Sequence, residues 1–287
     1  MRDAQPADGE MGRDLAALLE AARDMAAWVE RTLGELKPVT LRRLVRDPFA
    51  MIGRSVVVRQ TTSLRAAVML VDAGIGHAGL PMVRPACDEL IWVKYLATLS
   101  PGERGAVLLI LASVEGAELI GAQAAHLGPE AMSAVGFPPQ YVDAVKQQFA
   151  EGEGLLADAG RTLRWPKSPP SAWWLAKEVG LTDLYRFLYA ATCKGVHFSV
   201  TEHLRSGYND RTPDGPIAIA APAYVAYRSG FIIYWLCDLL VHTLTEVLNV
   251  TPDLNDAPQD DNFLPIIKRV AAYGKMPIVM PFEYNLE

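Results

Sequence analysis

Apolar residues recur at intervals of three and four positions along most of the chain, the spacing of one face of an α-helix. The first segment, residues 12–36, shows it with Leu15, Leu18, Leu19, Ala22, Met25, Ala26 and Val29. Neither an internal repeat nor a convincing strand alternation interrupts this pattern. The sequence therefore predicts an all-α protein, a multi-helix bundle of roughly eight to nine helices.

Glycine and proline mark the helix boundaries. Lys37 and Pro38 end the first segment, because the residue before proline avoids the α-helical region. Between Thr61 and Leu99 the glycines and prolines predict two helices or one strongly kinked central helix. The order Ser-Pro-Gly-Glu at 100–103 predicts a capped helix start, and this helix is expected to stop at Gly128 and Pro129.

Further helices are predicted over residues 138–163, 171–179, 182–205, 217–249 and 264–273, the third capped by Thr182. The proline-rich segment 164–171 is interpreted as a connection within one domain. We expect a disordered N-terminus over 1–10, a single all-α domain over 11–275 and a C-terminal tail over 276–287.

The most apolar stretch, residues 217–250, contains Arg228, Asp238 and His242, so it predicts a core helix and no membrane span. The polar N-terminus lacks a signal-peptide pattern. An odd number of cysteines, Cys87, Cys193 and Cys237, without metal-binding spacing favours a reducing compartment. Together these features predict a soluble cytoplasmic protein.

The net charge of −6 disfavours a broad nucleic-acid surface, since such surfaces depend on lysine and arginine. A local basic groove stays open, because Arg42, Arg43, Arg46, Arg54 and Arg59 follow one another closely. The alternative is an ordinary solvated surface.

No familiar nucleotide-binding, zinc-protease or serine-hydrolase motif is found, so the candidates are polar residues in apolar helices. Arg84 and Asp88 are one turn apart and Glu89 follows them. They are interpreted either as an internal ion pair or as the lining of a polar pocket.

A second candidate helix carries Tyr189 and His197, with Arg186 and Cys193 on the same side and Ser199 shortly after. A histidine there could act as an acid–base group or simply be a hydrogen-bonded core residue.

A secondary candidate is the helix with Arg228, Asp238 and His242, where Asp238 is spaced to orient His242. Its alternative interpretation is a wet helix face. Glu115, Glu118 and His126 lack the Glu-x-x-His motif of di-metal bundles, and neither a metal nor a cofactor is expected.

Two segments resemble a known family. The first runs from Leu80 to Leu96 and contains Arg-Pro-Ala-Cys-Asp-Glu-Leu-Ile-Trp-Val-Lys-Tyr-Leu; the second contains Asp-Leu-Tyr-Arg-Phe-Leu-Tyr-Ala-Ala-Thr-Cys-Lys-Gly-Val-His-Phe-Ser. They are similar to an uncharacterised family of bacterial all-helical proteins, domain-of-unknown-function family 5677, over residues 60–205. The resemblance places Arg84, Asp88 or Glu89, Tyr189, His197 and Ser199 on recurrent positions, although Asp88 stands where Glu is expected.

The family's charged set invites comparison with nucleotide-binding helical domains of toxins and phage defence. Such domains are ribonucleases that carry an arginine five to seven positions before a histidine on one helix. No histidine of this sequence follows an arginine at that spacing.

The preferred hypothesis is a polar pocket between the Arg84 helix and the His197 helix. Arg84 would bind an anion or pair with Asp88, Glu89 would position it, and Tyr189, His197 and Ser199 would face a small molecule or nucleotide. This describes a binding module of nucleotide- or nucleic-acid-linked type. Two alternatives stay open: a hydrolase using His197 with Glu89 or Asp88, with or without a metal, and a structural scaffold, homo-oligomeric or not, without catalysis.

Overall fold

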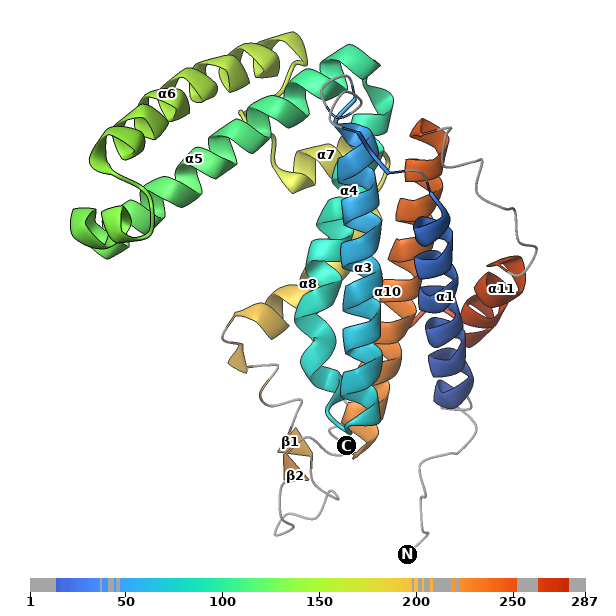
Figure 1. Cartoon of the computed structure of the whole chain (residues 1–287). Helices are drawn as coiled ribbons and strands as arrows, with labels where there is room; N and C mark the ends of the chain where they lie inside the picture. Colours follow the sequence, from blue (N-terminus) through green and yellow to red (C-terminus); the bar gives the residue numbers. More distant parts are fainter. Residues whose placement is uncertain are drawn as a thin grey trace, which may run out of the picture. The chain divides into compact units, whose positions relative to one another are not determined.

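The protein is almost entirely helical (Figure 1). The computed structural model describes residues 14–36, 38–40, 44, 47–197, 199–200, 203, 207–208, 218–219, 222–251 and 263–278. This part of the chain holds nine α-helices, one 3₁₀ helix and a single antiparallel pair of two-residue strands, Gly207–Tyr208 (β1) and Ala218–Ile219 (β2). The prediction of an all-α protein with eight to nine helices is confirmed.

The chain forms two compact units, each described here by itself. Unit 1 comprises Met1–Lys37, Gly53–Lys94 and Leu181–Glu287, and unit 2 comprises Pro38–Ile52 and Tyr95–Gly180. The division falls within two helices, α3 (Phe49–Asp72) and α4 (Val83–Thr98). The single domain expected over 11–275 stays a prediction. The expected disordered residues 1–10 and most of the expected tail lie outside the described residues.

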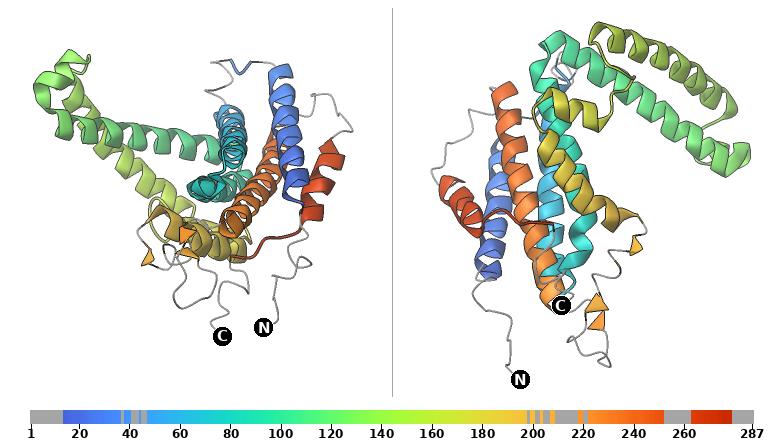
Figure 2. Two further views of the ribbon diagram at one scale, coloured as in Figure 1. Left: turned by 90° about the horizontal axis from the view of Figure 1, so that it is seen from below. Right: turned by 180° about the vertical axis from the view of Figure 1, so that it is seen from behind.

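Unit 1 is built around α10 (Pro222–Val250), which contacts α1 (Leu15–Glu35), α11 (Phe263–Tyr273) and the 3₁₀ helix η1 (Gly76–Met82). Figures 1 and 2 show α1 lying between α10 and α11. The rings of Trp28 on α1 and Phe263 on α11 are stacked with centroids 4.0 Å apart. The fully buried side chains of α10 include Phe231, Ile232, Ile233, Leu236, Leu239 and Leu240.

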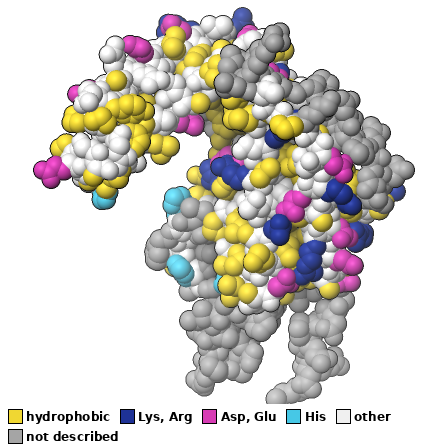
Figure 3. Space-filling model, viewed as in Figure 1, with side chains coloured by type: hydrophobic (Ala, Val, Ile, Leu, Met, Phe, Trp, Pro, Cys, Tyr) yellow, Lys and Arg dark blue, Asp and Glu magenta, His cyan; other side chains and the backbone are white. Residues whose placement is uncertain are grey.

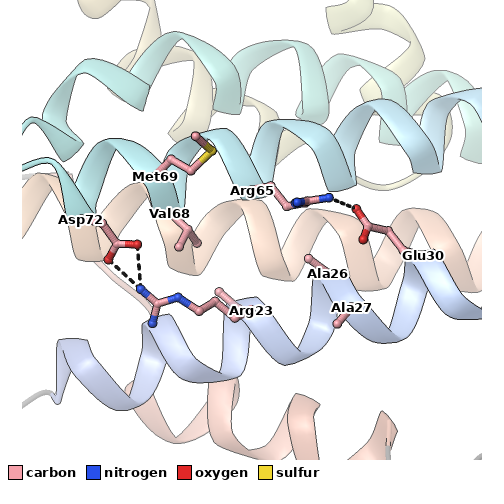
Figure 4. Close-up of a pocket in the computed structure, with 9 residues that line it drawn as sticks. Arg23, Ala26, Ala27, Glu30, Arg65, Val68, Met69 and Asp72 are labelled. Atoms are coloured by element: carbon pink, nitrogen blue, oxygen red, sulfur yellow. Dashed lines mark hydrogen bonds and ion pairs between the residues drawn. The ribbon is translucent and has the colours of Figure 1, made fainter.

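Two ion pairs join α1 to α3 (Figure 4). Arg23 donates to both carboxylate oxygens of Asp72, at 2.6 and 2.8 Å, and Arg65 donates to Glu30 at 2.7 Å. Such exposed pairs add about 0–1 kcal/mol each, so they contribute little to the stability of the contact between α1 and α3. Between the pairs lies a cavity of about 330 Å³ with Ala22, Ala26, Ala27, Val68 and Met69 in its lining.

The predicted break between Thr61 and Leu99 takes the form of η1, which contains Pro81 and separates α3 from α4. Gly76 is required there, because a Cβ atom at this position would overlap the side chains of Ser229 on α10 and Val71 on α3. The predicted start of the helical region at Thr61 is wrong, since α3 begins at Phe49. Its valine-rich first half has little helix preference, but Phe49 and Val57 are buried, and packing overrides propensity.

Helix α8 (Thr182–Val196) is shorter than predicted. His197 has an extended backbone (φ −108°, ψ 158°), so the helix ends nine residues before the expected Arg205. Gly195 and the β-branched Val196 both weaken the helix at this end. Thr182 is its first residue and does not cap it; Leu181 holds the cap position without a side-chain hydrogen bond.

Unit 2 consists mainly of a hairpin of α5 (Pro101–Ala134) and α6 (Pro139–Thr162), followed by α7 (Ala172–Glu178). The predicted capping box is present: Glu103 N–H donates to Ser100 Oγ at 3.4 Å, and Ser100 N–H donates to Glu103 Oε2 at 3.0 Å. Gly128, with φ of +76°, breaks α5 before Pro129, and one further helical segment follows. Only glycine adopts this conformation readily, which explains why the break was predictable.

Two helices, Pro101–Ala134 and Tyr224–Val250, are long and apolar enough to cross a membrane by length and composition alone. The second is mostly buried inside the protein, as predicted for a core helix. The first is mostly exposed, with Leu109 and Leu119 uncovered. Figure 3 shows hydrophobic side chains gathered around the turn between α5 and α6, where Leu127, Val135 and Tyr141 are also exposed.

Trp165 and Tyr95 provide a test of the unit 2 core. Both side chains are buried, and Trp165 Nε1–H donates to Tyr95 Oη at 2.6 Å. We expect Tyr95→Phe to lower the free energy of unfolding by about 1–3 kcal/mol, because the indole N–H loses this acceptor. Urea unfolding followed by fluorescence measures the change.

The matched control is Tyr141→Phe, whose ring is exposed, and it should change the free energy by less than about 0.5 kcal/mol. Equal effects of the two substitutions would contradict this account of the core.

Candidate functional site

The first two turns of α4 carry three predicted site residues on two sides of the helix. Asp88 and Glu89 are consecutive, and successive side chains on a helix point about 100° apart. Arg84 and Asp88 meet residues of α8, whereas Glu89 meets residues of α3. The three residues therefore belong to two neighbouring places and not to one pocket.

On the α8 side, Arg84 lies between Asp88 and two tyrosines. Arg84 Nε–H donates to Asp88 Oδ2 at 3.1 Å, the ion pair that their one-turn spacing predicts. The guanidinium carbon lies 4.2 Å from the ring centroid of Tyr189 and 5.8 Å from that of Tyr185. Both distances fit cation–π contacts. The structure thus brings Arg84 on α4 and Tyr189 on α8 into contact, and Tyr185 on α8 also contacts Arg84.

Burial governs the charges of this cluster. It raises the pKa of Asp88, and the neighbouring Arg84 guanidinium offsets only part of that effect. Burial likewise raises the pKa of Tyr185. Asp88 Oδ1 is buried and accepts no hydrogen bond from the described residues. The positive charge of Arg84 is thus already engaged by a carboxylate and two rings.

On the α3 side, Glu89 is nearly buried, with 9% of its surface exposed. Gln60 Nε2 donates to Glu89 Oε2 at 3.1 Å and to the carbonyl of Ala86 at 3.2 Å. Arg59 forms an ion pair with the same carboxylate, although 65% of its own side chain is exposed. Burial raises the pKa of Glu89, and these two partners only moderate the increase.

A cavity of about 300 Å³ opens beside Glu89 and Arg59. The remaining lining is Ser63 and the largely apolar set Pro81, Met82, Pro85 and Ala86. This volume is at the lower end of ligand pockets, which are typically apolar with a few convergent polar groups. We call the cavity and its lining the Glu89 pocket.

Arg59, Gln60 and Ser63 were not predicted as site residues. Arg59 and Gln60 lie in the half of α3 that the sequence pattern did not identify as helical, and their partner Glu89 is about 30 positions away. Arg59 appeared only as the end of a basic cluster. Arg42, Arg43 and Arg46 of that cluster lie outside the described residues.

His197 and Ser199 lie beyond the end of α8. His197 is exposed, and its backbone N–H donates to the carbonyl of Cys193 at 3.0 Å. It follows Tyr189 by eight residues, an axial rise of about 12 Å. In the described part of the chain, no hydrogen bond or ion pair joins His197 to Arg84 or Glu89. The roles assigned to His197 and Ser199 stay predictions.

The secondary candidates on α10 occupy two different environments. Arg228 is completely buried, with its guanidinium carbon 5.5 Å from the ring centroid of Tyr224. Asp238 and His242 form a pair at 3.9 Å whose histidine is 61% exposed. Asp238 follows Arg228 by ten positions, a rise of about 15 Å along the helix. Arg228, Asp238 and His242 therefore form neither one site nor one solvent-exposed face of α10.

The buried cysteines are structural in character. Burial raises the pKa of the Cys87 thiol to about 12 and raises that of Cys237 as well, so both are protonated at neutral pH. Within the described ranges, no three His, Cys, Asp or Glu side chains lie close enough to share a metal ion.

The raised pKa of Glu89 predicts a pH-dependent stability. The folded protein binds this proton more tightly than the unfolded chain, whose glutamate pKa is about 4.3. The resulting stabilisation is complete below that pH and is lost as the pH rises through the raised pKa. Glu89→Gln should therefore reduce the fall in Tm between about pH 4 and neutrality, as measured by circular dichroism.

Glu30→Gln, which removes an exposed carboxylate outside the Glu89 pocket, serves as the control for the loss of one negative charge. Parallel curves for wild type and Glu89→Gln would show that Glu89 titrates as an ordinary glutamate.

Comparison with known proteins bears on the α4 and α8 segments. A family model described as a family of unknown function (DUF5677) matches residues 50–215, which include all of α4 to α8. No curated protein and no solved structure matches the chain. The matched region covers more than half of the sequence and contains both segments that carry the resemblance. The chain therefore belongs to the family of unknown function DUF5677.

Proposed function

We propose that this protein is a binding module whose ligand occupies the Glu89 pocket. The observation that carries the proposal is a nearly buried carboxyl group facing a cavity with an otherwise largely apolar wall, paired with an exposed arginine at its edge. Buried ionisable groups with raised pKa values concentrate at functional sites. Holding such a group costs stability, which a binding role would explain.

The chemistry of the pocket favours a nucleotide. Glu89 accepts hydrogen bonds from ring N–H or amino groups of a base, and Met82 with the prolines offers an apolar surface to a flat ring. Arg59 has most of its side chain in solvent, so its guanidinium can bind a phosphate at modest desolvation cost. A ligand with donors at one end and an anion at the other fits this pair.

A hydrolase would need His197 to converge with Glu89 or Asp88, and its position beyond α8 provides no such contact among the described residues. The scaffold alternative has support from the Arg84 cluster, since Arg84 is already held by Asp88 and two tyrosines. The binding proposal therefore rests on the Glu89 pocket and not on Arg84.

Isothermal titration calorimetry with the four ribonucleoside monophosphates and their nucleosides tests the proposal. We expect at least one monophosphate to bind. Arg59→Gln should weaken it by about 10-fold to 100-fold, the value of a hydrogen bond to a charged group. The same variant should weaken the nucleoside much less, because the nucleoside has no phosphate for Arg59 to bind, whereas Glu89→Gln should weaken both ligands.

The matched control is Arg65→Gln, on the same helix and 60% exposed but paired with Glu30 outside the Glu89 pocket. It should preserve binding. If no nucleotide binds, or if Glu89→Gln binds with wild-type affinity, the proposal fails. Variants that lower Tm in a protein without nucleotide affinity would favour the scaffold alternative. Release of product from a bound nucleotide, abolished by His197→Ala, would favour the hydrolase.

A further inference from the structure

A second cavity, of about 420 Å³, lies in unit 1 between α8, α10 and the segment that follows α11. Its lining consists of Leu184, Phe187, Trp235, Lys275, Met276 and Pro277. None of these residues lines the Glu89 pocket. We call this cavity the Trp235 pocket.

The aromatic wall of the Trp235 pocket is well packed. The Phe187 ring on α8 lies 5.2 Å from that of Trp235 and 6.2 Å from that of Phe231, both on α10. Trp235 is only 5% exposed. Aromatic rings in such clusters offer a large apolar surface with little freedom to rearrange.

The opposite wall is attached to α10 by two hydrogen bonds. Trp235 Nε1–H donates to the carbonyl of Met276 at 3.2 Å, and Tyr227 Oη donates to the carbonyl of Pro277. The segment that closes the pocket is therefore held by side chains of the core helix. A cavity with both walls fixed is largely pre-formed, as ligand sites usually are.

Lys275 is the single charged residue of the lining. Its charge acts on Asp238, one turn beyond Trp235 on α10. That carboxyl is 27% exposed, forms a pair with His242 at 3.9 Å and is not among the residues that line the pocket. The lining thus combines apolar walls with one cation, whose charge also acts on the nearby carboxyl of Asp238.

We propose that the Trp235 pocket binds an apolar monoanion, such as an aromatic carboxylate. The apolar body of the ligand packs between Phe187, Trp235 and Leu184, and its carboxylate pairs with the ammonium group of Lys275. A neutral ligand would gain only the apolar contacts, and a cation would meet the like charge of Lys275. This site is separate from the Glu89 pocket, so either proposal can fail without the other.

Calorimetry with 4-phenylbutyrate and the neutral 4-phenylbutan-1-ol tests this assignment. The wild-type protein should bind the carboxylate about tenfold or more tightly than the alcohol, as one charge-assisted contact provides. Lys275→Gln should remove this difference and leave the alcohol affinity unchanged. Lys268→Gln, on the exposed side of α11, is the matched control and should behave as wild type.

Leu184→Trp locates the ligand, because a larger side chain fills the cavity and should weaken both compounds. Binding that is unaffected by Leu184→Trp in a folded variant would overturn the proposal. A preference for the carboxylate that persists in Lys275→Gln would overturn it equally, and this surface substitution should fold normally.

Discussion

Helix α10 carries apolar side chains on nearly all sides, and unit 1 is assembled by covering them. Phe231, Ile232 and Leu240 are fully buried, and burying each such side chain contributes about 1.5–3 kcal/mol. Helices α1, α11 and η1 supply the cover. Arg228 on the same helix is completely buried. Removing its charge from water costs free energy, which specific interactions such as its position over the ring of Tyr224 offset.

The position of the Glu89 pocket depends on this packing. Because Gly76 lets η1 approach Ser229 closely, α4 begins directly beside the covered core helix. The start of α4 then presents Glu89 to Gln60 and Arg59 on α3, and Arg84 to the tyrosines of α8. Arg84 and Glu89, although close in sequence, thereby reach different surroundings. Arg84 is held by Asp88 and two tyrosines, and Glu89 faces a cavity.

The two pockets of unit 1 differ in chemistry in a way that suits different ligands. The Glu89 pocket has a buried acid and an exposed arginine, whereas the Trp235 pocket has aromatic walls and one lysine. Neither lining contains a histidine, and the acid of the Glu89 pocket is the carboxyl group of Glu89 itself.

Sequence alone determined the features that depend on local spacing. Helical periodicity, the Ser100 capping box, the break at Gly128 and the Arg84–Asp88 pair were all predictable, because each involves residues within about one turn of one another. Only the tertiary structure joined Glu89 to Arg59 and Gln60. It also placed Arg84 over the ring of Tyr189. On α10 it buried Arg228 completely and left Asp238 partly exposed. It also ended α8 before His197. These outcomes depend on which side chains are buried against distant segments, and the periodicity of one helix does not specify its neighbours.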